Sequence, residues 1–379
     1  MARRSRPRAR QSRNATVRYA VIGLGHIAQA AVLPAFKHAG RNSVLAALVS
    51  SNPRKLQQLG RRYKVERLCG YDDVDELLAS GDIDAVYIAL PNDMHKEYTV
   101  RAARAGIHVL CEKPMAVTAR ECEEMIRVTR KARVKLMIAY RLHFERANLE
   151  AASQARAGKL GDLRYFSSDF SLQVREGNIR LERARGGGPL YDIGIYCINA
   201  ARYCFAAEPT EVLATAIRSA DRRFREVDET VTATMRFKDQ RLASFTCSFG
   251  AADRSTYSIV GTKGTLTVDP AYEYAEGLRY RVKVGERTQS RKLAKSDQFA
   301  AELLYFSDCV LNDRQPEPSG KEGLADVRII EGMQRSIATR RWITLKTPGQ
   351  RRRPTLRQAI RRTAVKREPK LVATSASSR

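Results

Sequence analysis

The chain has 379 residues, and its 68 lysines and arginines outnumber its 41 aspartates and glutamates, which gives a formal net charge of +27. This length fits two domains or one large one, and a hydrophobic content of 43% excludes a fully disordered chain. No run approaches the ~18 apolar residues of a membrane helix. Seven cysteines without a C-x-x-C pair argue against a disulfide scaffold or zinc ribbon and favour a reducing, cytoplasmic compartment.

The positive charge is concentrated at the two ends of the chain. Residues 1–18 carry +7 and residues 347–379 carry +9, and neither segment shows apolar periodicity. We therefore predict a disordered basic N-terminal arm and a disordered basic C-terminal tail. Such tails could bind nucleic acid weakly through counterion release, but neither interleaves aromatic residues with its arginines, so solvated tails are the favoured interpretation. No apolar segment follows Arg3 and Arg4, so we predict no export signal.

Apolar strands alternate with helices in the first part of the chain. The expected strands are 17–23, 44–50, 84–90, 108–111 and 135–140, and the expected helices are 29–36, 54–63, 73–80, 95–105 and 118–131. This alternation is typical of an α/β fold with a doubly wound parallel sheet. We assign it to a nucleotide-binding domain at residues 19–142.

The pattern changes after about residue 145. A helix is expected at 146–157, and strand-like alternation then appears at 163–172, 212–218, 231–237, 242–249, 257–260, 265–268 and 280–284. Residues 238–240 and 261–264 fit hairpin turns. We predict a second α/β domain at 143–346 with a large, open, mainly antiparallel sheet. One face of this sheet would be exposed to solvent, and helices at 189–205, 297–312 and 321–340 would cover the other face.

The first strand ends in the motif G-x-G-x-x-A at residues 23–28. Gly23 permits a tight turn, Gly25 lets the backbone approach a pyrophosphate, and Ala28 allows close packing of the following helix on the strand. Leu24, His26 and Ile27 belong to the same loop. The alternative, a purely structural glycine turn, is disfavoured by the strand–turn–helix context.

The end of the second strand indicates which dinucleotide is bound. An NAD site usually has Asp or Glu there for the ribose diol, but this strand continues as Ser50-Ser51-Asn-Pro-Arg54-Lys55 without an acid. Hydroxyl groups and two cations can instead hold a 2′-phosphate, so NADP is favoured over NAD. The alternative is that Arg54 and Lys55 are simply exposed on the next helix.

Two further segments follow parallel strands at their carboxyl ends, where such sheets bind ligands. The first contains Leu90, Pro91, Asn92 and His95, and the second is Cys111-Glu112-Lys113-Pro114. Lys113 is a long cation placed to reach a nicotinamide ribose and a substrate oxygen. His95 is equally explained as a hydrogen-bonded structural residue.

Far downstream, Asp192 and Tyr196 are spaced i, i+4 on an expected helix and would share one face. Asp192 could hold a substrate hydroxyl, and Tyr196 could move its proton if Lys113 favoured the phenolate. Tyr196 could also be an ordinary half-buried aromatic. No cluster of His, Cys and Asp has metal-ligand spacing, so no metal is expected.

These motifs together resemble the Gfo/Idh/MocA oxidoreductases, and the branch that contains glucose–fructose oxidoreductase and related aldose-oxidising enzymes in particular. The resemblance runs from about residue 18 to 342 and rests on G-L-G-H-I-A, L-P-N-D-M-H, C-E-K-P-M-A and G-G-G-P-L-Y-D-I-G-I-Y. It implies a Rossmann domain followed by an open-sheet domain that commonly mediates dimers or tetramers. It also implies hydride transfer between nicotinamide C4 and a sugar carbon, for example oxidation of an aldose at C1 to a lactone.

The resemblance also assigns roles to individual residues. Lys113 matches the lysine of the family's E-K-P motif, and Asp192 matches its active-site aspartate. Tyr196 occupies the position of the acid/base, where many members have histidine. Arg141 and Asn199 lie in matching segments and are candidates for substrate or nicotinamide contacts. A trans-dihydrodiol or 1,5-anhydrosugar oxidoreductase with the same residues, and a non-catalytic NADP-binding sensor, are the alternatives.

Overall fold

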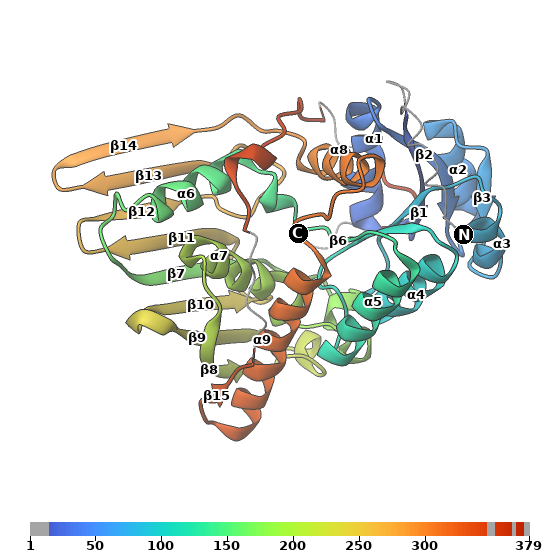
Figure 1. The fold of residues 1–379 in the computed structure, drawn as a ribbon. Coiled ribbons are helices and arrows are strands. Elements are labelled where there is room, and N and C mark those ends of the chain that lie inside the picture. The colour runs from blue at the N-terminus through green and yellow to red at the C-terminus, as the bar shows by residue number, and fades with distance from the viewer. Residues whose placement is uncertain (1–14, 347–352, 366–368, 375–379) are drawn as a thin grey trace, which may run out of the picture.

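Two β-sheets organise the chain, as the computed structural model in Figure 1 shows. The structure describes residues 15–346, 353–365 and 369–374. The predicted fold class is confirmed, because a six-stranded parallel sheet is followed by a nine-stranded, mostly antiparallel one.

The first sheet has the strand order β3-β2-β1-β4-β5-β6. Its strands are β1 (Val17–Ile22), β2 (Ser43–Val49), β3 (Arg67–Cys69), β4 (Ala85–Ile88), β5 (His108–Cys111) and β6 (Leu136–Ile138). β1 and β4 pair at the point where the strand order reverses, so their carboxyl ends open toward a ligand crevice. β4 is buried at every position, as expected of a strand covered on both faces.

Helices cover both faces of this sheet. They are α1 (Leu33–Ala39), α2 (Pro53–Tyr63), α3 (Val74–Ala79), α4 (His95–Arg104) and α5 (Ala119–Ala132), with a π-helical turn at Ala28–Val32 before α1. α8 (Gln298–Leu311) completes the layer beside α1. The prediction that residues 297–312 cover the second sheet is therefore wrong. The apolar side chains of α8 pack on β1 and β2, and the hydroxyl of Tyr19 lies 2.7 Å from that of Ser307.

The second sheet has the order β14-β13-β12-β11-β7-β10-β9-β8-β15. Its strands are β7 (Leu163–Ser171), β8 (Pro209–Ile217), β9 (Thr230–Phe237), β10 (Leu242–Ser248), β11 (Arg254–Gly261), β12 (Gly264–Val268), β13 (Arg279–Val284), β14 (Arg287–Lys292) and β15 (Ile343–Thr344). β7 and β10 run parallel, whereas the pairs on either side of them are antiparallel. β14 was not predicted because all six of its residues are polar and exposed.

Three helices lie on the inner face of the second sheet. α6 (Arg146–Arg156) and α7 (Ile195–Phe205) pack on its centre, and α9 (Gly320–Thr339) packs on β8 and on α5. The outer face is open to solvent: β9 alternates buried residues with partly or fully exposed ones. One apolar core runs without interruption from the first sheet to the second. The division at residues 142 and 143 therefore stays a prediction. None of the described helices is long and apolar enough to cross a membrane.

The described parts of the two basic ends do not form disordered tails. Val17 and Arg18 belong to β1 rather than to the N-terminal arm, of which residues 1–14 lie outside the described residues. In the C-terminal tail, Gln358 and Val372 are both buried against the body of the protein. The prediction of a disordered tail is thus wrong for residues 353–365 and 369–374. Residues 347–352, 366–368 and 375–379 lie outside the described part of the chain.

Candidate active site

A cavity of about 1260 Å³ lies where the carboxyl ends of the first sheet meet the second sheet. It gathers most of the predicted site residues, namely Gly23, Leu24, Gly25, His26, Ile27, Ser50, Ser51, Lys55, Leu90, Pro91, Asn92, Glu112, Lys113, Arg141, Asp192 and Tyr196. These residues come from six separate segments of the sequence. Their convergence on one cavity is typical of a ligand site in an open α/β sheet.

The glycine loop is shaped to receive a phosphate group. Gly23 has φ +95°, and a Cβ there would lie 2.5 Å from the carbonyl oxygen of Ala89, so only glycine fits. A Cβ at Gly25 would meet nothing within 4 Å, which shows that the backbone of Gly25 faces open space. The loop leads directly into a helical segment, whose N-terminus favours anions. These features fit a dinucleotide diphosphate.

The segment after β2 carries polar groups and no acid. Ser50 is buried, Ser51 lines the cavity, and Asn52 caps α2 by accepting a hydrogen bond from the backbone N–H of Lys55 at 3.1 Å. Lys55 reaches the cavity and is partly buried, which lowers the pKa of its ammonium group. Arg54, the residue before it, is exposed and does not line the cavity, so the structure does not bring Arg54 to the site.

Lys113, Asp192 and Arg180 form an ion-paired cluster at the centre of the cavity. Lys113 donates from Nζ to the backbone oxygen of Asp192 at 2.7 Å and to its Oδ1 at 3.2 Å. Arg180 donates from Nε to Oδ2 of Asp192 at 2.5 Å. Burial alone would raise the pKa of the Asp192 carboxyl, but the charges of Arg180 and Lys113 outweigh it and lower the pKa to about 2. Asp192 is therefore an anion with both oxygens held in place.

Two cations flank the ring of Tyr196. The Nζ of Lys113 lies 4.7 Å from the ring centroid, and the guanidinium carbon of Arg141 lies 5.0 Å from it. Burial would lower the pKa of Lys113, but Tyr196, Asp192 and Glu112 together raise it, so Lys113 keeps its charge. Asp192 lies in a π-helical turn, Leu190–Gly194, directly before α7. This wider turn and the first turn of α7 still place both side chains in the cavity.

Arg141 and Glu112 lie next to this cluster and are themselves held by hydrogen bonds. Arg141 is buried, donates to Oε1 of Gln298 at 2.6 Å and also contacts the backbone oxygen of Tyr272. Glu112 accepts a hydrogen bond of 2.8 Å from the hydroxyl of Tyr87. Burial raises the pKa of Glu112, although the charge of Lys113 opposes this effect.

Two other predicted residues lie away from the cavity. His95 is fully buried, and its ring nitrogens lie 2.8 Å and 2.9 Å from the backbone oxygens of Pro114 and Leu90. Burial lowers the pKa of His95, although both backbone contacts oppose this effect, and the ring positions these loops without lining the cavity. Asn199 is also buried, accepts a hydrogen bond from His143 at 2.7 Å and donates to Asp326 at 2.9 Å. The structure therefore does not support a substrate contact by Asn199.

Asn199 belongs to a buried polar network beneath α7. The guanidinium of Arg202, which is fully buried, pairs with Glu208 at 2.7 Å, Glu322 at 2.8 Å and Asp326 at 2.5 Å. Burial raises the pKa of Asp326, although Arg202 opposes this effect. The network holds α7, and with it Tyr196, against α9.

Several residues of the cavity were not predicted from the sequence. Arg180 comes from a short helical turn, Ile179–Leu181, and nothing in its surrounding pattern marks it as a site residue. Phe170, Tyr272 and Tyr274 form an aromatic wall beside Tyr196, with ring centroids 5.6 Å apart for Phe170 and Tyr196 and 5.9 Å for Tyr196 and Tyr272. The run A-Y-E-Y-A at 271–275 was the available signal for this wall.

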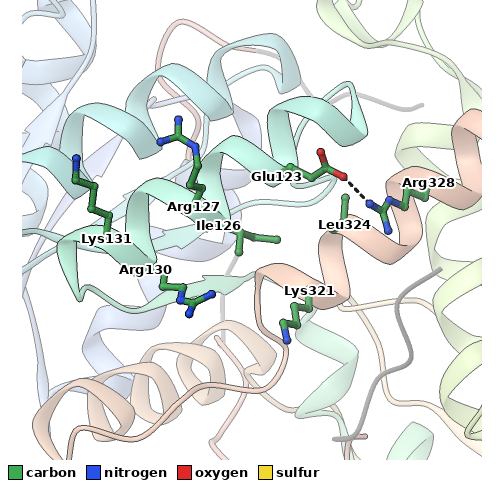
Figure 2. A pocket seen from close by; sticks show the side chains of 8 residues that line it. All are labelled: Glu123, Ile126, Arg127, Arg130, Lys131, Lys321, Leu324 and Arg328. Atoms are coloured by element: carbon green, nitrogen blue, oxygen red, sulfur yellow. Dashed lines mark hydrogen bonds and ion pairs between the residues drawn. The ribbon is translucent and has the colours of Figure 1, made fainter. Parts of the chain in front are cut away.

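A second hollow, of about 590 Å³, lies between α5 and α9 (Figure 2). Its lining residues are Glu123, Ile126, Arg127, Arg130, Lys131, Lys321, Leu324 and Arg328. Five of them are cations, and the acid Glu123 is bonded to Arg328 at 2.5 Å. This hollow contains none of the predicted site residues, so we place the active site in the larger cavity. Within the described part of the chain, no group of His, Cys, Asp and Glu is arranged to hold a metal ion.

The parallel sheet, the glycine loop and the Lys113–Asp192–Tyr196 cluster together define a nucleotide-binding oxidoreductase. Family comparison agrees with this class. Residues 17–140 match the model described as an oxidoreductase family with an NAD-binding Rossmann fold, and residues 149–267 match the GFO/IDH/MocA C-terminal domain. The chain belongs to the Gfo/Idh/MocA oxidoreductase family, as the resemblance predicts.

Individual relatives place the chain in the aldose branch of this family. The NADP⁺-dependent D-xylose 1-dehydrogenase of Haloarcula marismortui is 31% identical over 337 residues, which cover 87% of this chain and 93% of that protein. An aldose–aldose oxidoreductase from Caulobacter crescentus, solved with glycerol, has a TM-score of 0.83 and 38% identity over 87% of this chain and 100% of that one. A 3-ketoreductase from Actinomadura kijaniata, solved with NADP and TDP-benzene, has a TM-score of 0.78 and 26% identity over 85% and 98%. The prediction of an oxidoreductase of the aldose-oxidising branch is confirmed.

Proposed function

We propose that this protein is an NADP-dependent oxidoreductase that oxidises an aldose at C1 to a lactone, or carries out the reverse type of carbonyl reduction. The observation that carries this proposal is the cluster of Lys113, Asp192 and Tyr196 in a cavity that also holds the glycine loop. The named activities of the similar xylose dehydrogenase and aldose–aldose oxidoreductase support an aldose as the substrate.

The side chains of this chain divide the chemical work. When bound, the nicotinamide supplies the hydride acceptor or donor at C4. Asp192, whose two oxygens are held by Lys113 and Arg180, still has lone pairs to accept a hydrogen bond from a sugar hydroxyl. Tyr196 is the group that exchanges the proton of the reacting hydroxyl, and the charges of Lys113 and Arg141 lie beside its ring. The aromatic wall of Phe170, Tyr272 and Tyr274 offers an apolar surface on which a sugar ring can pack.

The first experiment mixes the protein with NADP and a panel of aldoses, ketoses, anhydrosugars and dihydrodiols, and follows the absorbance of the reduced nicotinamide. Steady growth with an aldose supports a dehydrogenase. A trans-dihydrodiol or 1,5-anhydrosugar as the best substrate would replace the aldose in the proposal while keeping the same residues.

Tyr196→Phe should lower turnover by about 10²–10⁴-fold, because it removes general acid–base catalysis, with unchanged NADPH binding. Near-normal turnover by this variant would refute the role of Tyr196.

The similarity to an aldose–aldose oxidoreductase favours a second mode of action. In this mode the cofactor stays bound. One sugar is oxidised and reduces the cofactor, and a second sugar is then reduced, which regenerates the oxidised cofactor. A single burst of reduced nicotinamide, equal in amount to the enzyme and reset by a second sugar, would distinguish this mode from steady release.

We infer the preference for NADP from the acid-free segment after β2. Lys55 lies in the cavity beside Ser51, whereas Arg54 points away from it, so the two adjacent cations form a matched pair. Lys55→Ala should lower the NADP-to-NAD ratio of kcat/KM about tenfold, as expected for the loss of one charge-assisted hydrogen bond to a 2′-phosphate. Arg54→Ala should leave the ratio unchanged. Equal effects of both variants would refute a direct contact by Lys55.

The outer face of the second sheet supports a homodimer or homotetramer. Tyr165 and Leu242 are register partners on neighbouring strands and are 48% and 45% exposed, and Ile217 is 62% exposed on β8. A flat sheet face with exposed apolar side chains is typical of an association surface. Light scattering should show an oligomer that Leu242→Lys weakens.

Seven free, buried cysteines also support a reducing, cytoplasmic location.

A further inference from the structure

The C-terminal strap, which we define as residues 353–365 and 369–374, joins the second sheet to the nucleotide loop (red in Figure 1). It lies beyond both segments that match the family, 17–140 and 149–267. Near its start, Arg353 pairs with Glu208 at 2.5 Å, and Gln358 donates to Oε2 of Glu317 at 2.6 Å. The backbone oxygen of Arg362 accepts a hydrogen bond of 3.0 Å from the N–H of Asp297. The strap is thus attached at several points before it reaches the first sheet.

Gln29 connects the last part of the strap to the glycine loop. This side chain is fully buried, and its Oε1 accepts a hydrogen bond of 2.7 Å from the N–H of Val372. Its Nε2 donates to the backbone oxygen of Val372 at 3.0 Å and to that of Leu24 at 2.9 Å. Loss of the strap would leave two polar groups of a buried amide without these partners, which is costly. The position of the strap and that of the glycine loop are therefore coupled.

Apolar packing and a further hydrogen bond hold the same segment. Val372 is 5% exposed and packs in the apolar cluster that contains Leu24 and Ala28. Arg62, at the end of α2, donates to the backbone oxygen of Lys370 at 2.7 Å. Two residues after Val372, Thr374 lines the active-site cavity. A segment far from the glycine motif in sequence thus forms part of the same cavity wall.

We propose that residues 369–374 are part of the dinucleotide site and that they slow the release of the bound cofactor. The inference rests on the proposed dinucleotide site but not on the identity of the sugar. Thr374 borders the cavity beside the loop that receives the diphosphate, and Val372 fixes Thr374 there through Gln29. A cofactor held between the glycine loop and the strap leaves only after this packing loosens, so the effect falls on the dissociation rate.

Stopped-flow displacement tests this proposal without any sugar. The reduced cofactor, NADPH or NADH according to which the full chain binds more tightly, is bound to the protein and displaced by excess oxidised cofactor while nicotinamide fluorescence is followed. The test variant ends at Val365, and the matched control ends at Thr374, so the control keeps the complete strap. Val372→Asp in the full-length chain is the second test variant and decides the question if the shortened chain does not fold.

We expect dissociation to become about tenfold faster or more in the chain that ends at Val365 and in Val372→Asp, and to stay unchanged in the chain that ends at Thr374. Dissociation rates within twofold of the full chain in both test variants would overturn the proposal. Faster release in a protein that oxidises none of the sugars would uphold the role of the strap and contradict the sugar activity instead.

Discussion

The clearest electrostatic prediction concerns Arg180, which the sequence did not mark and which holds Oδ2 of Asp192 at 2.5 Å. Lowering of the Asp192 pKa from 3.8 to about 2 corresponds to about 2.4 kcal/mol in favour of the ionised carboxyl in the folded state. Arg180 is the first of the charges that lower it, but its side chain is 31% exposed and is screened by solvent. We therefore expect Arg180→Gln to lower the free energy of unfolding at pH 7 by about 1 kcal/mol.

The pH dependence gives the sign of the effect. Because the folded-state pKa of Asp192 is depressed, its contribution is complete above 3.8 and is lost as the pH falls toward about 2. In Arg180→Gln the folded-state pKa of Asp192 rises toward the unfolded value, so the loss still begins near 3.8 but is smaller and ends at a higher pH. Urea denaturation between pH 2.5 and 7 measures both effects. Arg183→Gln is the control, because Arg183 bonds to Glu226 instead.

A double-mutant cycle isolates the pair. If Arg180 acts through Asp192, the cost of Arg180→Gln should largely vanish in a protein that already carries Asp192→Asn. The same cost in both backgrounds, or an unchanged acid limb of the stability profile, would refute the reasoning. Turnover should fall in Arg180→Gln because Asp192 then lacks one of its two anchors.

Three further predictions concern buried groups. Gly23→Ala should abolish dinucleotide binding in a titration, because its Cβ would lie 2.5 Å from the carbonyl oxygen of Ala89. Burial raises the pKa of Glu302 well above its ordinary 4.5, and neither carboxyl oxygen has a hydrogen-bond partner among the described residues. Glu302→Gln should therefore stabilise the protein more at pH 8 than at pH 4 in urea denaturation, whereas an equal change at both pH values would contradict an ionisation effect. Arg202→Met should cost about 3–5 kcal/mol of unfolding free energy, because the buried carboxyl groups of Glu322 and Asp326 lose their closest cation. A calorimetric loss below 1 kcal/mol would contradict this prediction.

The sequence predicted the parts of the site that depend on short-range geometry. The glycine loop needs Gly23 at a positive φ, and Asp192 and Tyr196 are close enough along the chain for one helical segment to place both in the cavity. For Lys113 and Tyr196 the residues suggested the predicted roles but left alternatives open, and the family resemblance favoured the catalytic ones. The sequence did not show which of the adjacent cations Arg54 and Lys55 lies in the cavity. Arg54 and Lys55 point in different directions because successive helical residues are rotated about the axis.

Long-range placement was not predictable from local patterns. Arg180 reaches Asp192 because the chain after β7 turns back toward the cavity, and no periodicity records that path. The apolar residues of α8 identified a buried helix but not the sheet that buries it. Residues 353–374 contain so many arginines that the composition predicted disorder, although buried Val372 packs in an apolar cluster and several hydrogen bonds hold the same segment.

The placement of α8 has a consequence for how the protein is made. Residues up to 142 contain all six strands of the first sheet, yet the face formed by Tyr19, Val21 and Leu48 is covered by a helix that ends only at Leu311. During synthesis this apolar face stays uncovered until α8 has been translated. The nucleotide-binding half, expressed alone as residues 15–142, would expose this face to solvent and would be prone to aggregation. The two halves therefore form one folding unit, in which the later half supplies the last layer of the earlier one.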